Sequence, residues 1–114
     1  MAATESSEEN YICVSVHERG SDALDASPLF EERITLIKAG SKDEAIQKAS
    51  QLVGQARHTY KNEAGDTITW TCRRIVDVVE MVDVAFIDGA EIWGRYFRDL
   101  AEYERFEAHC MDDP

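Results

Sequence analysis

Hydrophobic residues recur at every second position in two segments near the start of the chain, and this period constrains the fold more than any other feature. A period of two is that of a β-strand with one buried face. The apolar residues that share a face are Ile12, Val14 and Val16 in the segment 11–19, and Phe30, Ile34 and Leu36 in the segment 29–39. The sequence therefore predicts two strands, the first of them half-buried, joined by a polar loop at 20–28.

The period then changes to that of a helix. Ser41 is followed three residues later by Glu44, which is the pattern of a capping box at a helix N-terminus. Apolar residues follow at helical spacing, and Gly54 can end the helix. They are Ala45, Ile46, Ala49, Leu52 and Val53. The sequence predicts a helix over 41–54.

The stretch YKNEAGDTITW, residues 60–70, predicts a β-hairpin. Its NEAG portion fits a type I turn with Asn62 at the first position and Gly65 at the fourth, where glycine can take the left-handed conformation of a bulge. The resulting register pairs Asn62 with Asp66, Tyr60 with Ile68 and His58 with Trp70. A well-formed turn explains this motif without any binding role.

Two charged residues interrupt the apolar faces of the predicted strands. Arg74 falls within an even-numbered apolar series in the second hairpin strand, and Glu32 falls between Phe30 and Ile34. Either each strand carries a bulge that turns its charge outward, or both charges point inward. An inward charge needs a partner, because an unpaired buried charge is very costly. We expect the inward arrangement, with Glu32 and Arg74 on the same side of the sheet as a pair sealed in the core.

The last third of the chain predicts a second hairpin and a second helix. Asp88 and Gly89 are a short turn signal, and Ile92 and Trp93 begin a further strand. From about Phe97 the apolar spacing becomes helical. The residues that show this spacing are Leu100, Tyr103, Phe106 and Cys110.

This order of elements, β-β-α-β-β-β-α, indicates an α+β fold. We expect an antiparallel sheet of about five strands with two helices packed on one face. The domain boundaries follow from composition and periodicity: a flexible acidic arm at 1–9, a single domain at 10–110 and a tail at 111–114.

The formal net charge of −11 restricts the partners of the chain. An acidic surface repels phosphate backbones, which argues against direct nucleic-acid binding, and it attracts a protein partner with a basic surface. The same charge also keeps a small protein soluble without any partner. No apolar run approaches the roughly 20 residues of a membrane helix, and the polar, acidic N-terminus is neither a signal nor a transit peptide. We expect a cytoplasmic protein without membrane contact, and homo-oligomer formation stays open.

The reactive side chains show no spacing that is typical of catalysis or metal binding. The cysteines are Cys13, Cys72 and Cys110, and the histidines are His17, His58 and His109. No C-x-x-C pair occurs, the histidines share no metal-ligand spacing, and no phosphate-binding glycine loop is present. We expect buried free thiols, no catalytic residue, no metal and no cofactor.

Three stretches together resemble a bacterial family known as domain of unknown function 4288. They are LFEERITLIKAGSKDEAIQKA (29–49), YKNEAGDTITW (60–70) and DGAEIWGRYF (88–97). The residues that match the family pattern are Glu31, Glu32, Tyr60, Asn62, Gly65, Trp70, Gly89, Glu91, Trp93, Arg95 and Phe97. Cys72 and Gly94 depart from it, since the family pattern has an aromatic residue and a serine there. The resemblance implies the fold of residues 11–97 but no activity.

Two functions from different classes remain. The first is a non-catalytic acidic binding module, such as an inhibitor or immunity-type protein, for a basic protein partner. The second is a small-molecule-binding domain or small enzyme, with Glu32, Arg74 and Glu91 in an aromatic-lined pocket. The binding candidates are Glu32, Tyr60, Trp70, Arg74, Glu91, Trp93 and Arg95.

Overall fold

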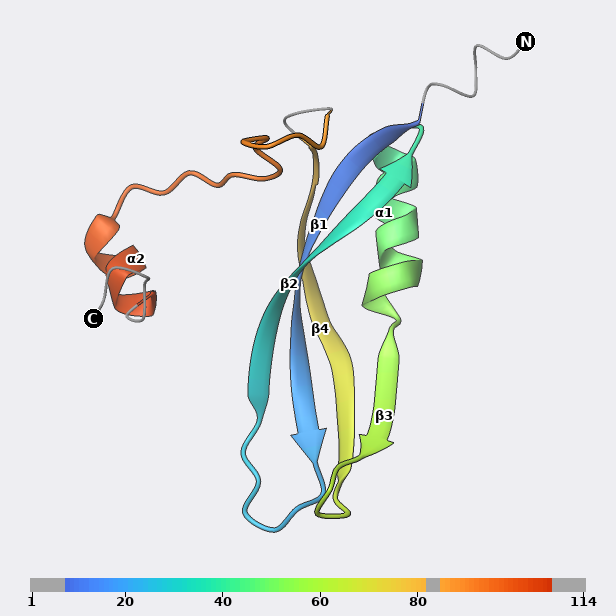
Figure 1. Cartoon of the computed structure of the whole chain (residues 1–114), viewed down its shortest axis with the longest axis vertical. Helices are drawn as coiled ribbons and strands as arrows, with labels where there is room; N and C mark the ends of the chain where they lie inside the picture. The colour runs from blue at the N-terminus through green and yellow to red at the C-terminus, as the bar shows by residue number, and fades with distance from the viewer. Residues whose placement is uncertain (1–7, 82–84, 108–114) are drawn as a thin grey trace.

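The computed structural model describes residues 8–81 and 85–107, which form an α+β fold (Figure 1). Its elements in chain order are β1 (Glu9–Ser21), β2 (Leu29–Ala39), α1 (Lys42–Ala49), the π-helical turn η2 (Ser50–Gly54), β3 (Arg57–Lys61), β4 (Thr67–Glu80) and α2 (Leu100–Phe106). In the described part of the chain, four strands form one antiparallel sheet in the order β2-β1-β4-β3. The fold class is therefore as predicted, with one strand fewer, because the segment around Ile92 and Trp93 is not a strand.

The central strand β1 is buried on both faces and not on one. It pairs with β2 on one side and β4 on the other. All five residues from Tyr11 to Ser15 are buried, so side chains that point to opposite faces are equally protected from water. The alternation of the sequence predicted the two faces correctly, but the expectation of a half-buried strand is wrong.

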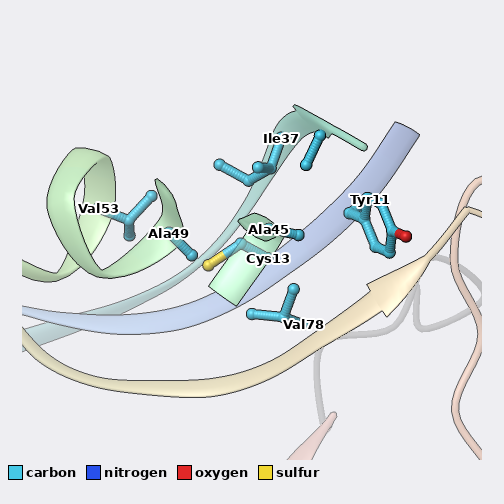
Figure 2. Close-up of a cluster of buried hydrophobic side chains, with 8 residues drawn as sticks. Tyr11, Cys13, Ile37, Ala45, Ala49, Val53 and Val78 are labelled. Atoms are coloured by element: carbon cyan, nitrogen blue, oxygen red, sulfur yellow. The ribbon is translucent and has the colours of Figure 1, made fainter. Parts of the chain in front are cut away.

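One face of the sheet, here named the helix face, is covered by α1 and η2. The helical residues Ala45, Ala49 and Val53 are buried there. Figure 2 shows them in one cluster with the sheet residues Tyr11, Cys13, Ile37 and Val78. Two of the three helical side chains are single methyl groups, which lets the helix backbone lie close to the strands. Ile46 and Leu52, which were expected on the same seam, are exposed.

The start of α1 follows the capping pattern of the sequence. The Ser41 hydroxyl accepts a hydrogen bond from the Glu44 backbone N–H at 3.2 Å. The Glu44 carboxylate accepts in return from the backbone N–H of Gly40, at 2.7 Å, and not from that of Ser41. Both bonds satisfy N–H groups at or next to the helix N-terminus. The helical run ends at Gly54, as predicted.

Strand β4 contains two extra residues where it pairs with β1. Arg73 and Val76 have no partner in the β1 register, so the ladder shifts twice. Each shift reverses the faces of the residues that follow. The first one places Arg74 opposite Val16, on the face away from the helix. The outward bulge, and not the inward charge, is therefore the correct explanation for Arg74.

The second face, here named the open face, is covered only in part. Ile12 and Val14 are buried beneath Met81 and Trp93. Three apolar residues of β2 on the same face stay exposed, and they are named the β2 row: Phe30 (56% exposed), Ile34 (47%) and Leu36 (43%). The pairing of β1 with β2 has no shift, so Glu32 lies within this row.

The C-terminal part differs most from the prediction. Gly89 adopts φ +89° in a turn closed by a hydrogen bond from Ala90 N–H to the Ile87 carbonyl at 3.0 Å. The described residues beside this turn are not strands, so the predicted hairpin is wrong there. Residues 1–7, 82–84 and 108–114 lie outside the described part of the chain, and they include His109, Cys110 and the predicted tail. Helix α2 begins after its cap Asp99, has no buried residue and stands away from the sheet (Figure 1).

Two buried polar side chains on the helix face, Ser15 and His17, satisfy each other. Ser15 and His17 are both buried, and the Ser15 hydroxyl lies 2.8 Å from His17 Nε2. Burial lowers the pKa of His17 below its ordinary value, the charge of Arg33 lowers it further, and Glu31 opposes them. His17 is thus held as a neutral imidazole within the sheet.

The hairpin geometry gives a test at Gly65. The predicted register is confirmed, with Gly65 at φ +88° and its N–H donating to the Asn62 carbonyl at 3.0 Å. No atom lies within 4 Å of an added Cβ, so a side chain would suffer from backbone strain alone. We expect Gly65→Val to lower the free energy of unfolding by about 1–2 kcal/mol. Urea denaturation measures this, and Gly65→Asn, which tolerates positive φ, should lose less. Equal losses in both variants would contradict the explanation.

The lowered pKa of His17 predicts a pH dependence of stability. The unfolded state binds the proton near the ordinary value of 6.5, whereas the folded state resists it. The contribution of His17 to the free energy of unfolding is therefore fully present above about pH 6.5, and it falls as the pH drops towards the pKa of His17 in the folded state. Denaturation midpoints between about pH 8 and about pH 5 should show this decline in the natural protein. The decline should be weaker in His17→Gln, and an equal decline would assign it to other groups.

Candidate functional site

Antiparallel pairing brings two glutamates together at one end of the sheet. Glu9 begins β1 and Glu80 ends β4, so the two residues lie at the same end of the sheet. Tyr11, which belongs to the buried cluster on the helix face, is directly opposite Glu80 in the register. Glu9 and Glu80 are both exposed. The acidic end is the name used below for Glu9, Glu80 and their neighbours Glu8 and Glu44.

The electrostatics of the acidic end show repulsion between like charges. The charge of Glu9, together with a hydrogen bond between the two carboxyl groups, raises the pKa of Glu80. Burial raises the pKa of Tyr11 above its ordinary value, and the charges of Glu9 and Glu80 raise it further. A carboxylate pair of this kind attracts a cation or a proton.

One lysine partly neutralises this cluster. Lys48 Nζ lies 3.7 Å from a carboxylate oxygen of Glu8 and 3.7 Å from one of Glu44, and it donates to the Lys38 carbonyl at 2.6 Å. Among the described residues, neither Glu9 nor Glu80 has an ion pair with a lysine or arginine. The acidic end therefore has unbalanced negative charge that is open to solvent.

A second candidate is a groove between β2 and the C-terminal segment, with a volume of about 620 Å³. We name it the aromatic groove. It is lined by Glu32, Arg95, Tyr96, Phe97, Arg98, Asp99, Glu102, Tyr103 and Phe106. The rings of Phe97 and Tyr103 are stacked, with centroids 4.6 Å apart. The volume is within the range of small-molecule sites, and the lining combines four aromatic with five charged side chains.

The structure divides the predicted binding candidates among separate places. Glu32 and Arg95 line the aromatic groove. Glu91 lies with Arg95 in a smaller hollow of about 260 Å³. Trp93 packs on the open face, and the Arg95 guanidinium lies 5.6 Å from the centre of its ring.

Glu32 and Arg74 do not form the predicted pair sealed in the core. Both lie directly opposite Val16 in the register, so they do share a face of the sheet as expected. Both are exposed, and within the described part of the chain no ion pair joins them. The physical reason is that no described segment covers this part of the open face, so neither charge has to be neutralised.

Tyr60 and Trp70 lie elsewhere, on the helix face beyond the end of α1. His58 pairs with Trp70 and Tyr60 with Ile68, as the hairpin predicted. The Arg33 guanidinium lies 5.3 Å from the centre of the Trp70 ring and also pairs with Glu31. These contacts support a structural role for the hairpin aromatics.

The described residues contain no group of three or more His, Cys, Asp or Glu side chains arranged to hold a metal ion. Cys13 is a buried free thiol whose pKa is raised by burial and by Cys72, which is half-buried and also free. No helix within 8–81 or 85–107 is long and apolar enough to cross a membrane.

The acidic end could not be found by periodicity. Glu9 fell within the expected mobile arm, and Glu80 lay beyond the last apolar position of its strand. Only the register of β1 against β4 brings them together. An acidic residue at the start of one antiparallel strand and at the end of its neighbour is the pattern that could have shown it.

Comparison with known proteins decides the family. The model of a domain of unknown function, DUF4288, matches residues 6–94. The chain belongs to the DUF4288 family. No curated protein and no solved structure matches it.

The matched range separates the two candidate sites of this DUF4288 protein. The acidic end lies entirely inside residues 6–94, as does all of the sheet. The aromatic groove lies outside the match except for Glu32. The acidic end is therefore built from the part of the chain that defines the family, whereas the groove depends on residues that follow it.

The raised pKa of Glu80 gives a test of the acidic end. Between the folded pKa and the ordinary value of about 4.5, the folded state binds more protons than the unfolded state. Repulsion from Glu9 therefore lowers stability at neutral pH and disappears as the pH falls. We expect Glu80→Gln to be more stable than the natural protein at pH ~7 and to lose this advantage towards pH ~4.5.

Chemical denaturation at several pH values measures this effect. Glu63→Gln is the matched control, because Glu63 is exposed at the hairpin tip, at the other end of the sheet from Glu9 and Glu80. If both variants gain equally, net charge and not the Glu9–Glu80 contact is responsible.

Proposed function

We propose that this domain is a non-catalytic protein-binding module whose acidic end receives a basic segment of a partner protein. The single observation that carries the proposal is the register of β1 against β4, which brings Glu9 and Glu80 to the same end of the sheet. The charge of Glu9 raises the pKa of Glu80 there. Two exposed carboxylates held together are unfavourable in the free protein. A lysine or arginine from a partner would relieve that repulsion, so part of the binding energy is already stored in the site.

The charge of the whole chain supports the same partner. With a net charge of −11, the protein attracts a basic surface over a longer distance than the local contact reaches. Such a module acts by occupying its partner and not by chemistry. This is the mode of action of an inhibitor or immunity-type protein, which would work in the cytoplasm where its partner is made.

The positions of the candidate residues weaken the catalytic alternative. Glu32, Arg74 and Glu91 were proposed to share one pocket, but only Glu32 lines the aromatic groove. Arg74 lies on the open face opposite Val16. Without convergence, these three side chains have no shared substrate to act on.

A small-molecule ligand in the aromatic groove is the second candidate. Its volume of about 620 Å³ and its four aromatic side chains favour this reading. Arg95 and Arg98 would then orient an acidic group of the ligand. The first proposal ranks higher because its site lies inside the family match.

Affinity capture from a lysate of the host, followed by binding kinetics, tests the first proposal. The natural protein should retain a basic protein that is lost with Glu9→Gln/Glu80→Gln. The matched control is Asp25→Asn/Glu63→Gln, which removes the same charge from exposed positions in loops. For the captured protein, we expect association to slow by about tenfold or more in the acidic-end variant and on raising the salt concentration.

The controls separate the alternatives. Equal slowing in both variants would mean that total charge acts and that the acidic end is not the site. A partner whose association is independent of salt and of both variants would contradict the proposal and favour an apolar interface.

A further inference from the structure

Two apolar surfaces have no cover from the residues that the structure describes. The first is the β2 row of Phe30, Ile34 and Leu36 on the open face. The second is the segment 95–106, named the C-terminal arm, in which Leu100 is 59% and Phe106 78% exposed. Apolar side chains left in water in this number mark an interaction site. The radius of gyration of 17.9 Å, against about 13 Å for a compact domain of this length, reflects the same open arrangement.

The aromatic groove lies between these two surfaces. Glu32, which lies between Phe30 and Ile34 of the β2 row, forms one wall, and the arm with α2 forms the other. Figure 1 shows α2 held away from the sheet at the end of an extended segment. The groove is therefore an open space beside the β2 row, with four aromatic side chains on the arm, and an amphipathic helix is a suitable occupant.

We propose that two copies of the chain exchange their C-terminal arms, so that α2 of each copy enters the aromatic groove of the other. In the resulting dimer the layers follow in this order: β2 of the first copy, α2 of the second, α2 of the first and β2 of the second. Each copy then covers the β2 row of its partner, and the two helices pack against each other on the symmetry axis. Such an interface uses the same surface twice and closes at two copies.

The charges of the arm are compatible with a second copy. Its arginines are Arg95, Arg98 and Arg105, and its acids are Asp99, Glu102 and Glu104. These charges cancel, so the arm carries no net charge in a chain of −11. It can approach the acidic partner without local repulsion, and its arginines can pair with Glu32, which otherwise interrupts the β2 row. The exchange gives this glutamate a role that the rest of the structure does not.

The competing arrangement is an arm folded onto its own sheet. Trp93 is fixed on the open face of its own copy, and the six residues 94–99 separate it from α2. An extended segment of that length reaches about 20 Å, which is sufficient for either arrangement. Chain length does not decide between them, so the test must distinguish contacts within a chain from contacts between chains.

Disulfide cross-linking makes this distinction. One chain carries Ile34→Cys and the other Leu100→Cys, both in a Cys72→Ser/Cys110→Ser background that keeps the fully buried Cys13. After oxidation of the mixed chains, exchange should give a cross-linked dimer of twice the 12.9 kDa chain mass. In the control, Leu52→Cys replaces Ile34→Cys; Leu52 is exposed on the outside of the helical layer and should not cross-link. The proposal would be overturned if no mixed dimer formed and if a single chain with both Ile34→Cys and Leu100→Cys formed an internal disulfide instead.

Light scattering on the full chain gives an independent measurement. The natural protein should be a dimer, and Phe106→Glu should be monomeric with unchanged circular dichroism, because Phe106 is exposed within each copy. Leu24→Glu, in a loop remote from the groove, is the matched control and should stay dimeric. Dimer formation should strengthen with salt, since two chains of −11 repel each other, whereas binding of a basic partner weakens. A monomer at all concentrations and salt levels would overturn the exchange and leave the acidic end unaffected.

Discussion

The fold depends on the close packing of a short helix against a central strand. Strand β1 is paired on both edges, and its segment from Tyr11 to Ser15 is buried on both faces. On the helix face this protection comes from Ala45, Ala49 and Val53, which are small enough for the helix to lie close to the sheet. A π-helical turn contains more residues than an α-helical turn. In η2 this keeps Val53, four residues after Ala49, facing the sheet.

A helix of this length cannot cover a sheet whose strands reach 14 residues. The helix also covers one face only, so the β2 row on the other face lies outside its reach. The exposed surfaces differ in chemistry. At one end, carboxylates collect where two strand termini meet. Along the edge strand β2, apolar side chains face water. The first surface suits a charged partner and the second an apolar one, so the two proposed interactions need not compete for the same area.

Local patterns predicted local structure well. The turn at Asn62, the limits of β2 and the cap at Ser41 each depend on residues close together in sequence, and each was predicted correctly. The bulges at Arg73 and Val76 were not located, because an extra residue shows itself only against the register of another strand. The same holds for Glu9 and Glu80, which are 71 positions apart in the sequence. The β2 row was predicted as a shared apolar face, but its exposure depends on where the C-terminal arm lies.

The two extra residues of β4 have an evolutionary consequence. Arg73 alone would leave the two halves of the strand presenting opposite faces to the helix, and Val76 restores the original side, so that Cys72 and Val78 both reach the helix face. A deletion at one position would be harmful unless the other was also lost, whereas a paired loss would preserve the core. Insertions and deletions in this strand should therefore occur in pairs, one at each bulge. Two gaps that look unrelated in an alignment would then be a single compensated event.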